Sequence, residues 1–414
     1  MREMKDSGIE WAGVIPNTWN INKGKYFMEL LTRPTLETDE VITCFRDGEV
    51  TLRSKRREEG FTVSLTEAGY QGIEIGDLVV HGMDGFAGSI GISDSRGKAT
   101  PVLNVLDTEQ NKRYMMYLMR TMAYCELFLS LATGIRVRTC DTNWKKLREI
   151  DYILPTIPEQ KAIADFLDEQ CAEIDTLVTD IQSQIEALEE YKRSVITEAV
   201  TKGIDPDVEM RDSGVQWIGM MPTHWDCQRG KYILRYVQKP VRDDDGVITC
   251  FRDGEVTLRS NRREEGFTMA DKEIGYQGID VGDLVVHGMD GFAGSIGISD
   301  SRGKASPVLN VLDTEQNKRY IMYYLRSMAY NDVFVALATG IRVRSCDLRW
   351  NKLAELLYSI PPIAEQQAIV EHIDSVLERT NAIIADKKQQ IETIEEYKKS
   401  LIFEYVTGKK EVQA

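Results

Sequence analysis

Histidines and closely spaced cysteines are scarce in this chain of 414 residues. It contains four histidines and seven cysteines, and no two cysteines form a C-x-x-C pair. Protein zinc sites need cysteine and histidine ligands at short, regular spacings, which are not found here. The sequence therefore predicts ordinary reduced thiols and no metal-binding residues.

Long apolar runs are also missing. No stretch approaches the roughly 18 apolar residues that a membrane-spanning helix requires, and residues 1–19 contain no apolar run of signal-peptide length. Hydrophobic residues make up 42% of the chain and charged residues 28%. These values are typical of soluble globular domains, and the length allows two or more of them. We expect a cytoplasmic protein.

Motifs for nucleotide hydrolysis and methyl transfer are absent as well. The sequence has no G-x-x-x-x-G-K-[ST] loop and no Asn-Pro-Pro-Tyr or Asp-Pro-Pro-Tyr tetrapeptide. Residues 85–91, repeated as 291–297, are similar to glycine-rich cofactor loops, but no strand–turn–helix unit surrounds them, so a tight turn is favoured. His81 and His287 have no acid, thiol or hydroxyl partner fixed by spacing. The sequence predicts no catalytic, cofactor-binding or metal residues.

The net charge of −15 is unusual for a protein that binds DNA, but the charge is unevenly distributed. Residues 41–148 contain 15 Lys and Arg against 13 Asp and Glu, a net charge of +2. Residues 149–210 contain 4 against 16, a net charge of −12. Because the acidity is concentrated in one segment, the total charge does not exclude nucleic-acid binding by the other.

The second half of the chain repeats the first at a constant offset of 206 residues (210 − 4). Residues 4–11 recur as 210–217, while 43–54 and 79–99 recur unchanged as 249–260 and 285–305. Between 41 and 140 most residues are identical to their partners, whereas the flanks keep only the pattern of residue types. Each repeat is therefore interpreted as a globular module followed by a less similar arm.

The module has short β-prone runs separated by glycines, at 41–45, 49–52, 77–81, 89–93 and 101–106. One helix is predicted over 111–131. The arm begins near Pro158, since proline is favoured in the first turn of a helix, and ends near Gly203. This combination predicts an α+β fold with a long helix after each module.

Apolar residues recur every seven positions along the first arm, which predicts a coiled-coil seam of about 60 Å. The seam consists of Leu167, Ile174, Ile181, Leu188 and Val195, with Cys171, Val178 and Ile185 four residues after the first three. The second arm has Ile373, Leu377, Ile384, Ile391, Ile394 and Leu401, interrupted by Thr380 and Lys387. We expect the arms to pair antiparallel with pseudo-twofold symmetry; two helices that each pack on their own domain are the alternative.

Several of these motifs resemble the specificity subunits of type I restriction-modification systems, along essentially the whole chain. They are the Pro16…Trp19 and Pro222…Trp225 entries, the Ser-Pro-Val-Leu-Asn-Val segment at 306–311, the Thr-Gly-Ile-Arg-Val-Arg segments at 133–138 and 339–344, and the Pro-Glu-Gln type of helix entry at 158–160 and 362–366. Thr100 replaces serine and Ala364 replaces proline in this pattern.

The resemblance implies target-recognition domains at 1–156 and 207–361, followed by spacer helices at 157–206 and 362–414. It implies a non-catalytic subunit in DNA methylation and antiviral defence, which binds double-stranded DNA and two adenine methyltransferase subunits. Two restriction and translocase subunits are a further option. S-adenosylmethionine, ATP and Mg would belong to these partners, and no cofactor to this chain.

Sequence reading needs side chains that reach base edges, whereas affinity comes largely from Lys and Arg on phosphates. Three clusters in each module supply both types, with Arg136 and Arg138 on the same side of an extended run. In the first module the candidates are Arg46, Arg53, Lys55, Arg56, Arg57, His81, Met83, Asp84, Phe86, Arg96, Lys98, Thr133, Arg136 and Arg138. In the second they are Arg252, Arg259, Asn261, Arg262, Arg263, His287, Met289, Asp290, Phe292, Arg302, Lys304, Thr339, Arg342 and Arg344.

Near-identical modules related by twofold symmetry predict a bipartite, near-palindromic DNA site. The difference between Lys55 and Asn261, and that between 63–68 and 269–274, could make the half-sites diverge. The alternative is a coiled-coil scaffold or adaptor that does not bind DNA. Co-purification of a methyltransferase distinguishes the two interpretations.

Overall fold

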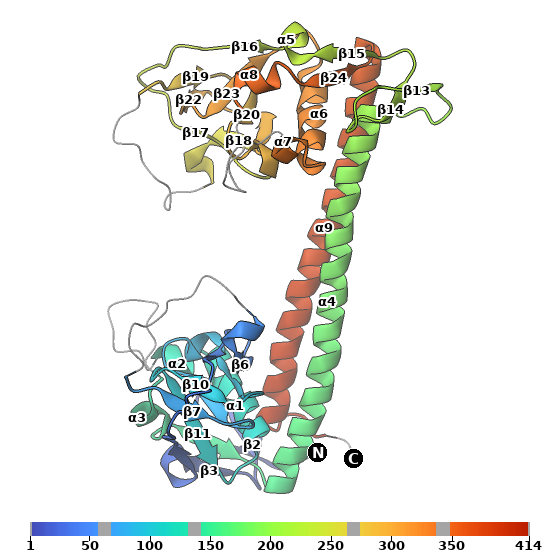
Figure 1. Cartoon of the computed structure of the whole chain (residues 1–414). Helices are drawn as coiled ribbons and strands as arrows, with labels where there is room; N and C mark the ends of the chain where they lie inside the picture. The colour runs from blue at the N-terminus through green and yellow to red at the C-terminus, as the bar shows by residue number, and fades with distance from the viewer. Residues whose placement is uncertain (1, 57–67, 131–141, 263–273, 337–347, 413–414) are drawn as a thin grey trace. The chain divides into compact units, whose positions relative to one another are not determined.

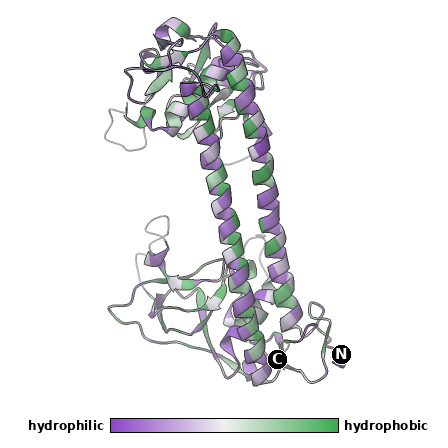
Figure 2. Ribbon diagram, turned by 90° about the vertical axis from the view of Figure 1, so that its right-hand side faces the viewer, coloured by the Kyte–Doolittle hydropathy of each residue, from purple (hydrophilic) through white to green (hydrophobic). Residues whose placement is uncertain are grey.

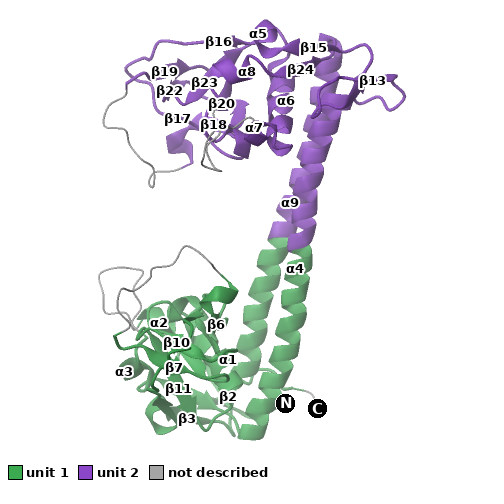
Figure 3. Cartoon of the chain, viewed as in Figure 1, with its two compact units in different colours: residues 1–181, 389–414 green, residues 182–388 purple. Residues whose placement is uncertain are grey.

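The computed structural model describes residues 2–56, 68–130, 142–262, 274–336 and 348–412 (Figure 1). The chain forms two compact units, residues 1–181 with 389–414 (unit 1) and residues 182–388 (unit 2; Figure 3). The two longest helices, α4 (Ile157–Lys202) and α9 (Ile363–Val406), are each divided between the units. Each unit therefore contains one globular domain and a part of both long helices.

The domain of unit 1 is built from short strands and a few helices. Its strands are β1 (Met4–Asp6), β2 (Val14–Pro16), β3 (Asn20–Lys23), β4 (Met28–Leu30), β5 (Ile42–Cys44), β6 (Val50–Leu52), β7 (Gln71–Ile73), β8 (Leu78–His81), β9 (Ile90–Ile92), β10 (Gly97–Ala99), β11 (Leu103–Thr108) and β12 (Asp151–Leu154). Its helices are α1 (Lys112–Tyr124), α2 (Leu127–Ser130) and α3 (Trp144–Leu147), with 3-10 turns η1 (Gly24–Tyr26), η2 (Arg53–Lys55) and η3 (Gly85–Ala87).

A four-stranded antiparallel sheet in the order β4-β11-β8-β9 forms the centre of this domain. The predicted strand runs at 77–81, 89–93 and 101–106 coincide with β8, β9 and β11. Leu78 and Val80 face the core shared with α1, whereas Val79 faces a second core beneath the β5–β6 hairpin. The alternation arises because successive strand residues point to opposite faces of a sheet.

Unit 2 repeats this domain element by element. Its strands are β13 (Met210–Asp212), β14 (Met220–Pro222), β15 (Asp226–Arg229), β16 (Arg235–Tyr236), β17 (Ile248–Cys250), β18 (Val256–Leu258), β19 (Gln277–Ile279), β20 (Leu284–His287), β21 (Ile296–Ile298), β22 (Gly303–Ala305), β23 (Leu309–Asp313) and β24 (Leu357–Ile360). Its helices are α5 (Gly230–Ile233), α6 (Lys318–Tyr330), α7 (Val333–Ala336) and α8 (Trp350–Leu353), with η4 (Arg259–Asn261) and η5 (Gly291–Ala293). The central sheet has the order β16-β23-β20-β21, which corresponds to that of unit 1.

The single helix predicted over 111–131 is interrupted in the structure. Asn111 caps α1 by accepting hydrogen bonds from the amides of Arg113 and Tyr114, but the helix ends at Tyr124. Glu126 then adopts a left-handed conformation with φ 59°, and the equivalent Asp332 has φ 55°. This backbone conformation breaks the helical hydrogen-bond ladder, so that α2 begins as a separate helix.

The long helices begin close to the predicted starts, but they end before residues 206 and 414, since α4 ends at Lys202 and α9 at Val406. Helix α4 starts at Ile157, directly before Pro158, and ends at Lys202. Gly203 follows with φ 80°, the left-handed conformation that commonly ends a helix. With 46 residues, α4 is about 69 Å long at 1.5 Å per residue.

Within unit 1 the two long helices run antiparallel. The ring of Phe166 lies 4.4 Å from that of Tyr405, and Lys398 donates to both carboxylate oxygens of Asp175 at 2.6 and 2.7 Å. Moving forward along α4 therefore corresponds to moving backward along α9. The predicted seam residues Leu167 and Cys171 are buried there.

Within unit 2 the pairing is also antiparallel, and the two polar seam residues of α9 have partners. Thr380 is buried and donates its hydroxyl to the carbonyl of Val376 in its own helix at 2.8 Å. Lys387 donates to the side-chain oxygen of Gln184 on α4 at 2.5 Å. Hydrophobic residues recur among hydrophilic ones along both helices (Figure 2). Among the described residues, no helix combines the length and apolar character that crossing a bilayer would require.

The Pro-Glu-Gln entry of α4 joins this helix to the domain of unit 1. The indole N–H of Trp19 donates to Glu159 at 3.1 Å. The buried Gln160 accepts a hydrogen bond from the Asn111 amide at 2.9 Å and donates to Pro155 and Gln110. The motif that carries the family resemblance is therefore a structural connection between a domain and its spacer helix.

Candidate nucleic-acid interface

The turn after β8 and the turn between β5 and β6 meet at the surface of unit 1. The guanidinium of Arg46, in the second turn, lies 3.0 Å from the carboxylate of Asp84, in the first. Gly91 on β9 allows the β5–β6 turn to pack closely on β9, because a Cβ there would lie 1.9 Å from the carbonyl oxygen of Gly48. The first two predicted clusters are thus brought together at Arg46 and Asp84.

His81 organises the turn that carries Asp84. Its Nδ1 accepts hydrogen bonds from the amides of Met83 and Asp84 at 3.2 and 2.9 Å. Burial lowers the pKa of His81, while the charge of Asp84 partly opposes that shift. A neutral ring that accepts at Nδ1 carries its proton on Nε2, so His81 positions Asp84 through the backbone.

Arg56 lies over an aromatic ring beside two carboxylates. Its guanidinium carbon is 4.2 Å from the centre of the Phe45 ring. The same guanidinium lies 2.7 Å from Asp47 and 3.0 Å from Glu49. The ring and the carboxylates together hold one arginine in a defined orientation on the β5–β6 turn.

Arg53 and Lys55 occupy η2, which follows β6. Arg53 donates to the hydroxyl of Thr43 at 3.2 Å. Lys55 donates to Asp94 at 3.2 Å and to Ser95 at 2.8 Å. Both cations thus lie beside the β5–β6 hairpin, and their role in DNA contact stays a prediction.

Arg96 belongs to a different part of the domain. It donates to both carboxylate oxygens of Asp39 at 3.1 Å and also pairs with Glu74. The carboxylate of Asp39 is only 3% exposed, and this bond lowers its pKa. The ion pair between Arg96 and Asp39 therefore connects two loops of the domain and has a structural role. Lys98, on β10, lies on the strand that follows this network.

The two apolar candidates after His81 have different environments. The Met83 side chain is half exposed, so it can reach a ligand. Phe86, in η3, is partly buried and packs against the main core of the domain. Its position indicates a packing role, and the glycine-rich residues around it form a tight turn between β8 and β9.

Unit 2 reproduces these contacts with one informative difference. Arg252 pairs with Asp290 at 3.2 Å, and His287 accepts from the amides of Met289 and Asp290 at 3.3 and 2.9 Å. Asn261 replaces Lys55 and donates to Thr257 at 2.8 Å. The remaining equivalents keep their places: Arg259 beside Thr249, Arg262 over Phe251, Phe292 against the core, Arg302 on Asp245, and Lys304 on β22.

Eight of the predicted residues lie outside the described residues. They are Arg57, Thr133, Arg136, Arg138, Arg263, Thr339, Arg342 and Arg344. Thr142, the first described residue after 131–141, donates its hydroxyl to the carbonyl of His81 at 2.9 Å and its amide to that of Gly82 at 2.9 Å. The segment with the third cluster is therefore followed directly by a residue attached to the His81 turn.

The sequence interpretation missed the acidic side of this surface and one arginine that supports it. Asp47 and Glu49 were not among the candidates, although both contact Arg56. Arg120 on α1 donates to the carbonyls of Ile90 and Gly48 at 2.7 and 2.9 Å and so fixes the β5–β6 turn. The available signal for the two carboxylates was that the same pair stands at the same spacing before Arg56 and before Arg262 in the two repeats.

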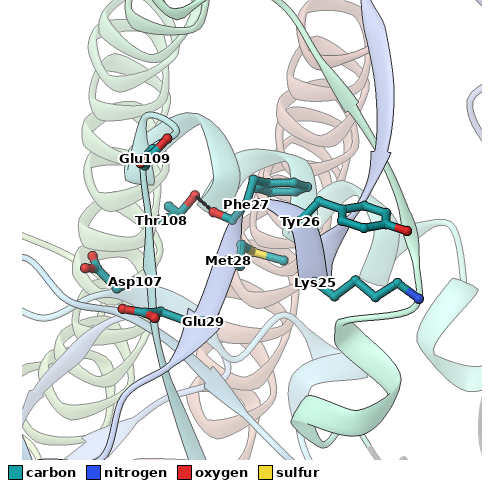
Figure 4. Close-up of a pocket in the computed structure, with 8 residues that line it drawn as sticks. All are labelled: Lys25, Tyr26, Phe27, Met28, Glu29, Asp107, Thr108 and Glu109. Carbon is teal, nitrogen blue, oxygen red and sulfur yellow. Dashed lines mark hydrogen bonds between the residues drawn. The ribbon is translucent and has the colours of Figure 1, made fainter.

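The described residues contain no group of three or more His, Cys, Asp or Glu arranged to hold a metal ion. A hollow of about 530 Å³ in unit 1 is lined by residues 25–29 and 107–109 (Figure 4). Thr108 donates to the carbonyl of Phe27 at 2.7 Å in its wall. None of the described DNA-contact candidates lines this hollow.

This chain is similar in sequence to two type I restriction enzyme specificity subunits and similar in fold to a chain of a type I R-M system. No protein-family model matches the chain. Two relatives from Methanocaldococcus jannaschii do: a type I restriction enzyme MjaX specificity subunit, 22% identical over 321 residues, and the MjaVIII specificity subunit, 25% identical over 322. These alignments cover 74% and 73% of this chain, and 71% and 72% of the relatives.

One solved structure shares the fold over nearly the whole length. It comes from work on complex assembly and conformational transition of the type I R-M system, and its chain matches with a TM-score of 0.65 at 11% identity. The match covers 95% of this chain and 98% of that chain. The predicted resemblance and the α+β fold class are thus confirmed.

Proposed function

We propose that this chain is the DNA sequence-recognition subunit of a type I restriction-modification complex, with no catalytic site of its own. The observation that carries the proposal is the repetition of one arginine-bearing surface in both units. Arg46, Arg56 and His81 have the same partners as Arg252, Arg262 and His287. Arginine is the side chain best suited to phosphate contacts and to guanine edges.

The target proposed for these surfaces is a bipartite, near-palindromic DNA site. Near-identical reading surfaces favour near-identical half-sites. The way the repeats complete each other's domains also supports symmetry. Tyr114 donates to the carbonyl of Val406 in unit 1, and its equivalent Tyr320 donates to that of Val200 in unit 2. Reciprocal contacts of this kind are characteristic of isologous assemblies.

The partners proposed are two adenine methyltransferase subunits, with restriction and translocase subunits as further components. S-adenosylmethionine, ATP and Mg would be bound by these partners. Each unit exposes two aliphatic residues and one tyrosine on its long helices: Ile157, Leu177 and Tyr397 in unit 1, and Ile363, Ile383 and Tyr191 in unit 2. Because these are equivalent positions of the two repeats, they support docking of two copies of the same partner.

Methylome sequencing tests the proposal. The chain is expressed with a type I adenine methyltransferase subunit in a host that has no other DNA methylation. We expect one methylated bipartite motif whose half-sites are inverted copies, and loss of the motif when both Arg46 and Arg252 are replaced by alanine. Unrelated half-sites would contradict the symmetry, and a chain that neither co-purifies with a methyltransferase nor directs methylation would support the scaffold alternative.

A further inference from the structure

We propose that Asp47 and Glu49, with their equivalents Asp253 and Glu255, are specificity-determining residues that withhold Arg56 and Arg262 from the phosphates of non-target DNA. This inference rests on the proposed DNA-reading function.

The contact geometry of these arginines is the same in both units. In unit 1 the Arg56 guanidinium lies 2.7 and 3.0 Å from Asp47 and Glu49 and 4.2 Å from the centre of the Phe45 ring. In unit 2 the corresponding distances of Arg262 are 2.7, 3.0 and 4.3 Å. A phosphate offers a guanidinium the same kind of charged oxygens as these carboxylates do, so DNA must compete with them for the arginine.

Exposure shows that the fold does not depend on this ion pair. Asp47 and Glu49 are 54% and 50% exposed, and Arg56 is 35% exposed. Ion pairs at such positions contribute little to stability, because water solvates both partners well. Arg96 provides the contrast, since its partner Asp39 is only 3% exposed. DNA phosphates can therefore replace the carboxylate partners of Arg56, whereas the ion pair of Arg96 with Asp39 is structural.

Replacement of the carboxylate partners of Arg56 by DNA is expected to differ between target and non-target sites. Non-target binding consists almost entirely of phosphate contacts, each of which releases a counterion and steepens the dependence of affinity on salt. An arginine that remains paired with its carboxylates contacts no phosphate and therefore releases no counterion. In the target complex the correct register offers base edges as well, so the arginine leaves the carboxylates and contacts DNA. Like-charge repulsion between the carboxylates and misplaced phosphates adds to the discrimination.

The test compares salt dependence on two duplexes of equal length, one with the methylome-defined site and one with both half-sites scrambled. The full chain is used, alone and with its methyltransferase. The quadruple variant Asp47→Asn, Glu49→Gln, Asp253→Asn and Glu255→Gln keeps the side-chain shapes but removes the charges. On the scrambled duplex its slope of log affinity against log salt should steepen by about 0.9 for each released arginine, about 1.8 in total. On the target duplex the slope should stay unchanged.

A control variant with the same gain of four charges separates local exchange from net charge. It carries Glu10→Gln, Asp205→Asn, Asp207→Asn and Glu209→Gln, all at exposed positions outside the proposed surface and chosen so that no ion pair of a described Lys or Arg is broken. Its slope on scrambled DNA should stay within about 0.5 of the unmodified chain. Equal steepening in the control and in the quadruple variant would overturn the inference.

The double variant Arg56→Ala and Arg262→Ala gives the converse test. It should weaken target binding at least about tenfold, a typical loss for a base-contacting arginine, yet leave the slope on scrambled DNA unchanged. A flatter slope on scrambled DNA would show that these arginines already contact phosphates, and would overturn the inference alone. Absence of any DNA binding by the unmodified chain and its complex would instead contradict the proposed function.

Discussion

Replacement of Gln160 with alanine should destabilise unit 1 and leave unit 2 unchanged. Gln160 is fully buried and holds three groups: it accepts from the Asn111 amide at 2.9 Å and donates to Pro155 at 2.9 Å and Gln110 at 2.7 Å. The buried Asn111 amide left without a partner costs about 1–3 kcal/mol, and each of the two other lost bonds costs about 0.5 kcal/mol. We therefore expect a loss of about 2–4 kcal/mol, localised where α4 meets the N-terminus of α1.

Hydrogen exchange followed by mass spectrometry suits this prediction better than a single melting curve. A chain of two compact units need not unfold in one step, and exchange reports the opening free energy of each segment separately. In the Gln160→Ala protein, peptides that cover the start of α1 should exchange faster, by roughly 30- to 1,000-fold at the stated cost. The corresponding peptides of α6 should keep their rates.

Two matched substitutions serve as controls. Gln170→Ala changes the same residue type in the same helix, where the partly exposed side chain donates to Glu173 at 3.2 Å. It should change exchange little, because alanine favours the helix. Gln366→Ala, whose side chain makes the equivalent contacts with Asn317, should transfer the effect to unit 2. Equal effects of Gln160→Ala and Gln170→Ala would refute the reasoning.

Two further predictions concern pH and the end of α9. Burial lowers the folded-state pKa of His81 and His287. As the pH falls below about 6.5, the unfolded chain therefore binds protons before the folded chain does. The free energy of unfolding should decrease from that pH down to the folded-state pKa. Asparagine at both positions should flatten this loss, measured as the shift in urea midpoint between pH 7.5 and 5.5; an unchanged shift would contradict it. Tyr114→Phe removes the buried hydroxyl that bonds Ile153 and Val406, and should speed exchange at the end of α9, consistent with a loss of about 1–2 kcal/mol, while unaltered exchange would count against that role.

Local pattern was sufficient to predict the repeating architecture. The seven-residue periodicity through Leu167 and Ile181 gave the long helices, because it reflects a continuous buried seam that any helix pairing must keep. The strands β8, β9 and β11 were likewise predicted from glycine-bounded β-branched runs. The break after α1 was not predicted, because glutamate is an ordinary helix former and its residue type does not mark the left-handed conformation that Glu126 adopts.

The candidate interface was predictable only as a set of residue types. Arg46 and Arg96 looked alike in the sequence, yet one is exposed beside Asp84 and the other is tied to the buried Asp39. The partners lie 38 and 57 residues away along the chain, so spacing could not distinguish them. The role of His81 was equally hard to predict, because its hydrogen-bond donors are two backbone amides that no sequence pattern marks.

The division of α9 between the units has a consequence for how the duplicated chain folds. The domain formed by the first repeat buries Leu401, Ile402 and Val406 from the end of the second repeat's helix, whereas the domain of the second repeat buries Ile196 and Val200 of the first. Neither repeat therefore contains all of the apolar surface that its own domain needs. Unit 2 is continuous in sequence, but unit 1 combines both ends of the chain. The core of unit 1 is complete only when residues 401–406 pack on the first domain. These contacts join residues that are far apart in sequence, so their formation carries the largest loop-closure cost in folding.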